Sequence, residues 1–155
     1  PNKGFMLHQL SKEDVNETFQ IRSALESYCT LQICKEANSR KAGKLFKELN
    51  KIMEKMEKIM ISSHSIDDFC EYDFRFHTQI INYLENEQFS SIFATFMYRM
   101  KRLAKLSLSH EGRMENTYKE HMDILNAMQS GDVEHIYDIT IQHMERPKGI
   151  NLEDL

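Results

Sequence analysis

Apolar side chains recur at helical spacing along almost the whole chain, and this periodicity limits the possible fold more than any other feature. Residues three and four positions apart share one face of an α-helix. With only five Gly and two Pro in 155 residues, the chain also has few of the turn formers that an all-β fold needs. We therefore predict an all-α fold whose six helices cover about residues 11–37, 40–61, 65–85, 88–109, 114–130 and 133–145.

Residues typical of helix ends support these limits. Ser11 and Ser65 are each followed by an aspartate three residues later, a variant of the capping box that begins a helix. Gly131 has the position of a glycine just beyond a helix C-terminus, and Pro147 is expected to end the last helix. Because the connections between neighbouring helices are short, we expect an antiparallel bundle.

The length and charge of the chain restrict its organisation and its partners. We expect residues 11–147 to form one domain, residues 148–155 a C-terminal tail, and residues 1–10 a preceding segment of different composition. The formal net charge of −4 offers no basic excess for the phosphates of duplex DNA, and no segment reads as a helix-turn-helix. A DNA-reading element of the parent protein would therefore lie outside these residues.

Neither a membrane span nor a disulfide framework is expected. No apolar run reaches the roughly 18 to 20 residues that a membrane-spanning helix needs, so we expect a soluble protein. Cys29, Cys34 and Cys70 form no paired pattern. We expect them to be reduced thiols packed in the core, as in a cytoplasmic protein, and not zinc ligands.

Four side chains that can bind metals fall on the apolar faces of three predicted helices. Asp73 and His77 lie one turn apart on the third helix, His121 lies on the fifth and His143 on the sixth. The apolar rows that contain them are predicted to be Phe69, Tyr72, Phe76, Ile80 and Leu84; Tyr118, Met122, Leu125 and Met128; and Val133, Ile136, Tyr137 and Thr140. Taken singly, each group has an ordinary alternative as a hydrogen-bonded core histidine or an aspartate paired with an arginine.

Taken together, these four groups favour a metal site, because one divalent cation would satisfy all of them at once. One oxygen and three nitrogen ligands suit Zn, Ni, Mn, Fe or Co, and the lack of thiolate argues against a closed structural zinc finger. With Asp73 ionised and the histidines neutral, a bound divalent metal leaves a net charge of about +1 on the site. Coordination positions left open by the protein would then attract an anion, most naturally a carboxylate.

Arginine side chains near this site are candidate contacts for such an anion. Arg22 lies near the inward side of the first helix, and its planar fork suits bidentate binding of a carboxylate. The alternative is an ion pair with Glu26 one turn later, which does not exclude contact with a ligand. Arg99, with Arg102 nearby, is a further candidate, for which a surface or dimer-interface role is the alternative. The remaining histidines, His8, His64, His110 and His135, are expected to be solvated.

These residues belong to an ordered set of motifs that resembles the FCD domain, the C-terminal effector domain of FadR-type GntR transcription regulators. The motifs are I-R-S-A-L-E (21–26), D-F-R-F-H (73–77) with Asn86 nine residues later, E-H-M-D-I-L-N-A-M (120–128), G-D (131–132) and I-Q-H-M (141–144). The resemblance spans about residues 15–144. The first helix departs from the alanine-rich continuation usual in that family at Tyr28, Cys29 and Gln32.

The resemblance implies more than the residue pattern does. It implies an antiparallel bundle of the six-helix form and a homodimer. It implies a divalent metal, expected to be zinc in the isolated protein, with a small organic acid that reaches both the metal and Arg22. The ligands would be Asp73, His77, His121 and His143. The opening P-N-K-G-F-M-L is similar to the end of a winged-helix domain, so residues 1–10 would follow a DNA-binding domain that contacts operator DNA.

We therefore predict the ligand-sensing and dimerisation domain of a cytoplasmic transcription regulator, and not an enzyme. Binding of the effector would reposition the bundle and re-space two DNA-binding domains through the first helix. The alternative is a metal-dependent enzyme that acts on a small organic acid, because such a site can activate water; Tyr72, Tyr118 and Glu120 would then be candidate bases. A purely structural bundle is a third possibility, and it predicts no metal.

Overall fold

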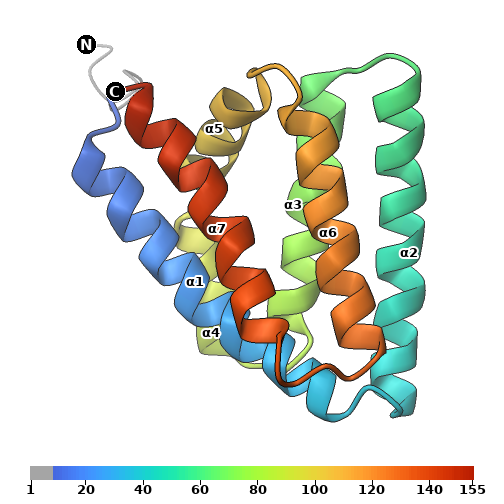
Figure 1. Ribbon diagram of the computed structural model, residues 1–155. Coiled ribbons are helices and arrows are strands. Elements are labelled where there is room, and N and C mark those ends of the chain that lie inside the picture. The colour runs from blue at the N-terminus through green and yellow to red at the C-terminus, as the bar shows by residue number, and fades with distance from the viewer. Residues whose placement is uncertain (1–8) are drawn as a thin grey trace.

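The computed structural model describes residues 9–155, and in this range the chain forms seven α-helices and no strand (Figure 1). The all-α prediction is confirmed. The helices are α1 (Lys12–Lys35), α2 (Arg40–Ile61), α3 (Ile66–Asn82), α4 (Glu87–Thr95), α5 (Met97–Leu108), α6 (Arg113–Gln129) and α7 (Ile136–Glu153). None of these helices is long and apolar enough to cross a membrane. Most of the segment that resembles the end of a winged-helix domain, with His8, lies outside the described residues.

Two groups of helices make up the bundle. In Figure 1, α2, α3 and α6 stand side by side, while α1 and α7 run diagonally across them in opposite directions and pack along each other. The main apolar core includes fully buried Phe69, Leu49, Met56, Leu125 and Ile136 from four different helices. Because α1 packs against both α3 and α6 as well as α7, the middles of these four helices approach one another inside the bundle.

The predicted N-terminal caps form as the sequence indicates. The Ser11 hydroxyl accepts a hydrogen bond of 3.1 Å from the backbone N–H of Asp14, and the Asp14 carboxylate accepts one of 2.9 Å from the backbone N–H of Ser11. This reciprocal capping box begins α1. The Ser65 hydroxyl caps α3 by accepting a hydrogen bond from the Asp68 backbone N–H at 3.2 Å, without the reciprocal bond that completes a capping box at α1.

Two predicted helix limits are wrong. The helix predicted over residues 88–109 is divided at Phe96 into α4 and α5. Because of this division, α4 packs against α3, while α5 packs against both α3 and α7. The local sequence contains no Gly or Pro that would indicate a break between two helices. The last helix does not end at Pro147 but continues to Glu153. Pro147 removes one backbone donor, yet the following turn stays helical and buries Asn151.

The inward face of the last helix also differs from the predicted row. The helix begins at Ile136 instead of Val133, and the Val133 and Tyr137 side chains are exposed. Ile136, Thr140 and His143 are buried as expected, and Met144 is buried beside them. Only one face of α7 packs on α1, α5 and α6. The predicted apolar row was wider than this face, so it included Val133 and Tyr137, which face solvent.

The connection from α6 to α7 depends on Gly131. Its φ of +68° is in the left-handed region, where glycine alone carries no steric penalty. The backbone N–H of Gly131 donates to the carbonyl of Met128, and that of Asp132 donates to the carbonyl of Ala127. These two bonds form a Schellman motif and confirm Gly131 as the glycine just beyond this helix end. A Cβ atom here would also lie 3.4 Å from the carbonyl oxygen of Cys34.

We expect the substitution Gly131→Ala to destabilise the fold by about 1 kcal/mol, because alanine is strained at positive φ. The matched control is Gly43→Ala on the exposed side of α2, where a Cβ atom meets nothing within 4 Å. That change should stabilise the chain by about 0.5 to 1 kcal/mol, since alanine is the better helix former. Urea denaturation of both variants measures the difference, and a shift of both midpoints in the same direction would contradict this account.

Candidate metal centre

Three helices place Asp73, His77, His121 and His143 around one point inside the bundle. Asp73 and His77 come from the middle of α3, His121 from the middle of α6 and His143 from the middle of α7. One ligand atom from each of the four lies within 4.8 Å of the others. The three histidines are buried, and the Asp73 side chain is 13% exposed. The structure therefore brings together all four residues singled out in the sequence.

The orientation of two imidazoles is fixed by buried carboxylates. Nδ1 of His77 is hydrogen-bonded to Oε1 of Glu26, a residue of α1, and Nδ1 of His143 is hydrogen-bonded to Oε1 of Glu120 at 2.6 Å. A carboxylate accepts hydrogen bonds only, so each Nδ1 carries the proton as the donor. The Nε2 atoms of the neutral rings then present lone pairs toward the common point, as metal-binding imidazoles do.

These lone pairs have no adequate partner within the protein. The two Nε2 atoms of His77 and His143 face each other at 3.2 Å, although both are acceptors in the tautomers just described. Nε2 of His121 lies 2.9 Å from Oδ1 of Asp73, yet both ring nitrogens of His121 are buried without a hydrogen-bond partner. Such groups are costly to bury, and a cation at their centre would satisfy them.

The spacing of the ligand atoms also fits a metal ion. Oδ1 of Asp73 lies 3.4 Å from Nε2 of His77 and 2.9 Å from Nε2 of His121. Ligand atoms held about 2.0 to 2.1 Å from a first-row metal lie roughly 3.0 to 3.4 Å apart when they are neighbours in the coordination sphere. These two spacings suit a divalent ion, whereas the widest pair of ligand atoms, up to 4.8 Å apart, has to close to about 4.2 Å or less around a metal.

The protonation states of these groups favour metal binding. Burial lowers the pKa of His121 to about 3, although the Asp73 carboxylate opposes this effect, and burial also lowers the pKa of His143. Burial alone would raise the pKa of Asp73, but contacts with His121 and His77 hold it well below its usual range. His77 differs: burial opposes its charge, yet Glu26 raises its pKa. Of the three imidazoles, His77 therefore holds a proton most strongly and competes most with a metal for its lone pair.

Glu26 and Glu120 were not predicted to support the site, because their histidine partners come from other helices. Glu26 also accepts a 3.0 Å hydrogen bond from Nε of Arg22; His77 and Arg22 together hold its pKa at about 2, against the effect of burial. Glu120 accepts bonds of 2.7 Å from both terminal nitrogens of Arg113. The i,i+7 spacing of Arg113 and Glu120, two turns apart on one helix face, is the sequence signal that was available.

The sequence-predicted arginines take different positions. Arg22 is 9% exposed and lines a small cavity together with Asp73, His77 and His143, and its predicted ion pair with Glu26 is present. Arg99 does not line this cavity; its guanidinium contacts the Thr18 hydroxyl at 3.4 Å and the Asp14 carboxylate at 3.4 Å. Arg22 therefore lies at the cluster, and Arg99 lies apart from it.

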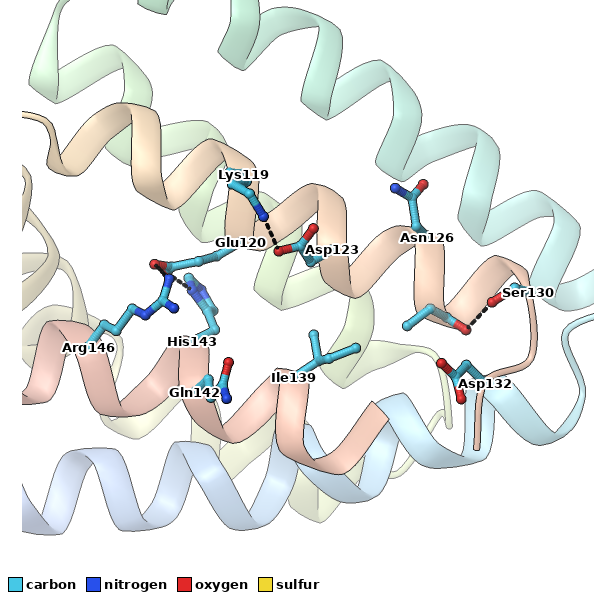
Figure 2. Close-up of a pocket in the computed structure, with 11 residues that line it drawn as sticks. Lys119, Glu120, Asp123, Asn126, Ser130, Asp132, Ile139, Gln142, His143 and Arg146 are labelled. Atoms are coloured by element: carbon cyan, nitrogen blue, oxygen red, sulfur yellow. Dashed lines mark hydrogen bonds and ion pairs between the residues drawn. The ribbon is translucent and has the colours of Figure 1, made fainter. Parts of the chain in front are cut away.

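A larger groove reaches the same cluster from outside. It has a volume of about 570 Å³ and runs between α6 and α7, with Glu120, His143 and Arg146 gathered at one end (Figure 2). The half-exposed Arg146 donates a 2.9 Å hydrogen bond to Glu120. The groove is larger than the cavity that Arg22 lines, but the cavity contacts three of the four candidate ligands, so we regard the cavity as the chemically relevant space.

The other titratable groups named in the sequence lie away from the cluster. His64, His110 and His135 are exposed and contact Glu115, Asp154 and Asp132 respectively. Cys29, Cys34 and Cys70 are free, buried thiols, and burial raises their pKa values to about 12, 11 and 12. A thiol with so high a pKa stays protonated at neutral pH and is a poor metal ligand.

Comparisons with known proteins agree with the resemblance seen in the motifs. A model of the FCD domain family matches residues 17–146. The HTH-type transcriptional repressor RspR of Escherichia coli (strain K12) is 21% identical over 145 residues, which cover 94% of this chain and 61% of the relative. The HTH-type transcriptional regulator YdfH of Shigella flexneri matches with the same identity and coverage. The chain thus spans 61% of the length of the curated relatives it matches.

Two solved structures of one protein share the fold. The metal-free FCD domain of TM0439 has a TM-score of 0.76 and 20% sequence identity, and the Zn²⁺-bound FCD domain of TM0439 has a TM-score of 0.71 and 18% identity. Each comparison covers 95% of this chain and 97% of the other. At this level of identity the two structures establish the common fold.

We expect the substitution His121→Ala to abolish metal binding, because its Nε2 is one of the four converging atoms and no other described residue replaces it. Metal analysis after dialysis against zinc should fall from about one ion per chain to nearly none. The exposed His110 on the turn before α6 provides the control, and His110→Ala should retain the wild-type metal content. Full metal occupancy in the His121 variant would exclude the proposed ligand set.

Loss of a supporting carboxylate should weaken the site without removing a ligand. Glu26→Gln takes away the charge that orients His77, and the zinc affinity should fall by about 10- to 100-fold. Competition with a chromogenic chelator measures this affinity. Glu115→Gln, which changes a glutamate paired with the exposed His64, serves as the control and should leave affinity unchanged; equal affinities in both variants would show that Glu26 does not support the ligand.

Proposed function

Because the chain belongs to the FCD domain family, we propose that it is the effector-sensing domain of a GntR-type transcription regulator, in which a bound divalent metal and Arg22 together receive a small carboxylate. The observation that carries this proposal is the cavity that Arg22 shares with Asp73, His77 and His143. Metal ligands and a buried guanidinium on the walls of one small cavity are what an anionic organic ligand requires.

The choice of metal is part of the proposal. The donor set of one carboxylate and three imidazoles suits several divalent ions, and zinc is expected in the isolated protein because one relative of the same fold has a Zn²⁺-bound form. When bound, the metal would supply coordination positions that attract a carboxylate oxygen. The residues of this chain would do the rest: Glu26 and Glu120 orient two ligands, and Arg22 provides the donor fork.

A chain of contacts links the effector to α1. Arg22 holds Glu26, and Glu26 holds His77, so a carboxylate that takes donors from Arg22 competes with Glu26 for the same guanidinium. The position of α1 against α3 depends in part on these buried contacts. A ligand shifts this arrangement only as far as its affinity differs between the two states. We propose that this shift re-spaces the DNA-binding domains of a cytoplasmic homodimer on operator DNA.

No observation favours the enzyme alternative. Of the candidate bases named from the sequence, Glu120 is held by Arg113, Arg146 and His143. Tyr72 and Tyr118 are partly buried against the main apolar core, and the pKa of Tyr118 is raised, mainly by burial. The function proposed for this site is stoichiometric binding of an effector.

We expect Arg22→Ala to weaken the binding of a small carboxylate such as malonate to the zinc-loaded protein by at least about tenfold, because one charge-assisted contact is lost. Isothermal titration calorimetry measures the affinity, and metal analysis of the same sample shows whether the metal stays bound.

Arg99→Ala is the matched control and also tests the prediction that Arg99 contacts the effector. Since Arg99 lies outside the cavity, we expect its substitution to leave the affinity close to that of the wild type. Unchanged malonate affinity in the Arg22 variant, with metal still bound, would refute the assigned role of Arg22.

A further inference from the structure

A second arginine, from α6, also lines the cavity. Arg113 is the first residue of α6 and is 4% exposed, and it shares the cavity with Arg22, Asp73, His77 and His143. No sequence motif singles out this residue, and in the function proposed above Arg113 only supports Glu120. Because Arg113 lines the cavity, a ligand bound there would contact its guanidinium.

The hydrogen bonds of Arg113 are incomplete. Its two terminal nitrogens donate end-on to the two oxygens of Glu120, each at 2.7 Å. The Nε–H group is buried and has no hydrogen-bond partner among the described residues. A guanidinium bound end-on keeps its Nε edge for another acceptor, and a buried donor left without one is costly. An acceptor from outside the protein fits this position.

The charges around the cluster set the class of ligand. Three carboxylates, Asp73, Glu26 and Glu120, contact the cluster or its histidines, and three guanidinium groups, Arg22, Arg113 and Arg146, contact two of these carboxylates. These charges balance one another, with Arg146 partly in solvent. A divalent metal therefore leaves an excess of one positive charge among the buried groups, or two when the largely solvated Arg146 is counted, and a buried charge excess of this kind favours an anionic ligand.

The size of the cavity limits the ligand further. The cavity has a volume of about 20 Å³, which is space for one or two water molecules. Leu108 and Pro147 contribute apolar side chains to its wall. A long or bulky acid would require the helices to separate, whereas a short carbon spacer between two acidic groups fits with the smallest displacement.

We infer that the effector is a short dicarboxylate of about two to four carbons, with one carboxylate on the metal and Arg22 and the other on the free Nε edge of Arg113. This inference rests on the function proposed above and specifies its ligand. Arg113 is the specificity-determining residue, because it offers a donor to the second acidic group that a monocarboxylate leaves unpaired.

The test compares malonate with malonamate, its monoamide, which has nearly the same size and one charge fewer. Calorimetric titration of the zinc-loaded chain should show malonate binding at least about tenfold more tightly. Both carboxylates of malonate can also chelate zinc, and that preference would not depend on Arg113. The substitution Arg113→Gln should therefore bring the malonate-to-malonamate affinity ratio close to one while the zinc content, measured on the same samples, is retained.

The matched control is Arg146→Gln, which removes another guanidinium from the same Glu120 but lies outside the cavity. It should keep the wild-type affinity ratio. Arg113→Lys preserves a cation against Glu120 and lacks the Nε edge, so it replaces the Gln variant if that variant does not fold.

The outcomes separate this inference from the function on which it rests. Equal binding of malonate and malonamate by the wild type would overturn the inference alone. A malonate-to-malonamate affinity ratio that stays high in the Arg113 variants would also overturn it, and so would an equal loss of this ratio in Arg146→Gln. Absence of binding by malonate, malonamate and acetate to the zinc-loaded chain would contradict the proposed function itself.

Discussion

The structure depends on the burial of three imidazole lone pairs and one carboxylate that face one another inside an apolar bundle. Without a cation, His77 and His143 point acceptor atoms at each other and His121 has no hydrogen-bond partner. In a low-dielectric interior such an arrangement is unfavourable. The apolar core therefore keeps these acceptor atoms together, while the Asp73 carboxylate is stabilised by its contacts with His121 and His77, and a divalent ion would satisfy all four ligand atoms at once.

Two similar chains of hydrogen bonds, each running from an arginine through a glutamate to a histidine, hold this centre. On one side Arg22 binds Glu26, which binds His77; on the other Arg113 binds Glu120, which binds His143. Each glutamate fixes the tautomer of a ligand, and each arginine offsets the cost of burying that glutamate. The same two arginines line the cavity beside the cluster, so the groups that stabilise the ligands are also the groups that an anion would contact. Binding of an anion and orientation of the metal ligands are thus coupled, because both use the hydrogen-bond donors of Arg22 and Arg113.

The helices that contribute these supports explain how a local event can change the whole bundle. Glu26 and Arg22 belong to α1, and α1 packs along α7, which contributes His143. A change at either arginine therefore acts on the contact between α1 and α7 as well as on the cluster. Pro147, which lines the cavity one turn after His143, cannot donate to the His143 carbonyl. The backbone of α7 is consequently least constrained by its own hydrogen bonds where it borders the ligand space.

The sequence by itself determined the all-α class, most helix limits, the Ser11 and Ser65 caps, the Gly131 helix end and the four side chains of the cluster, because helical periodicity and capping are local properties of the chain. It did not determine the division of α4 from α5 at Phe96, the continuation of α7 past Pro147, or the exposure of Tyr137, since packing between distant segments overrides local preference there. The pairing of Glu26 with His77 and of Glu120 with His143, the separation of Arg99 from the cluster, and the place of Arg113 on the cavity wall were decided by tertiary structure alone. These contacts join residues of different helices, and no spacing within one helix specifies how two helices meet.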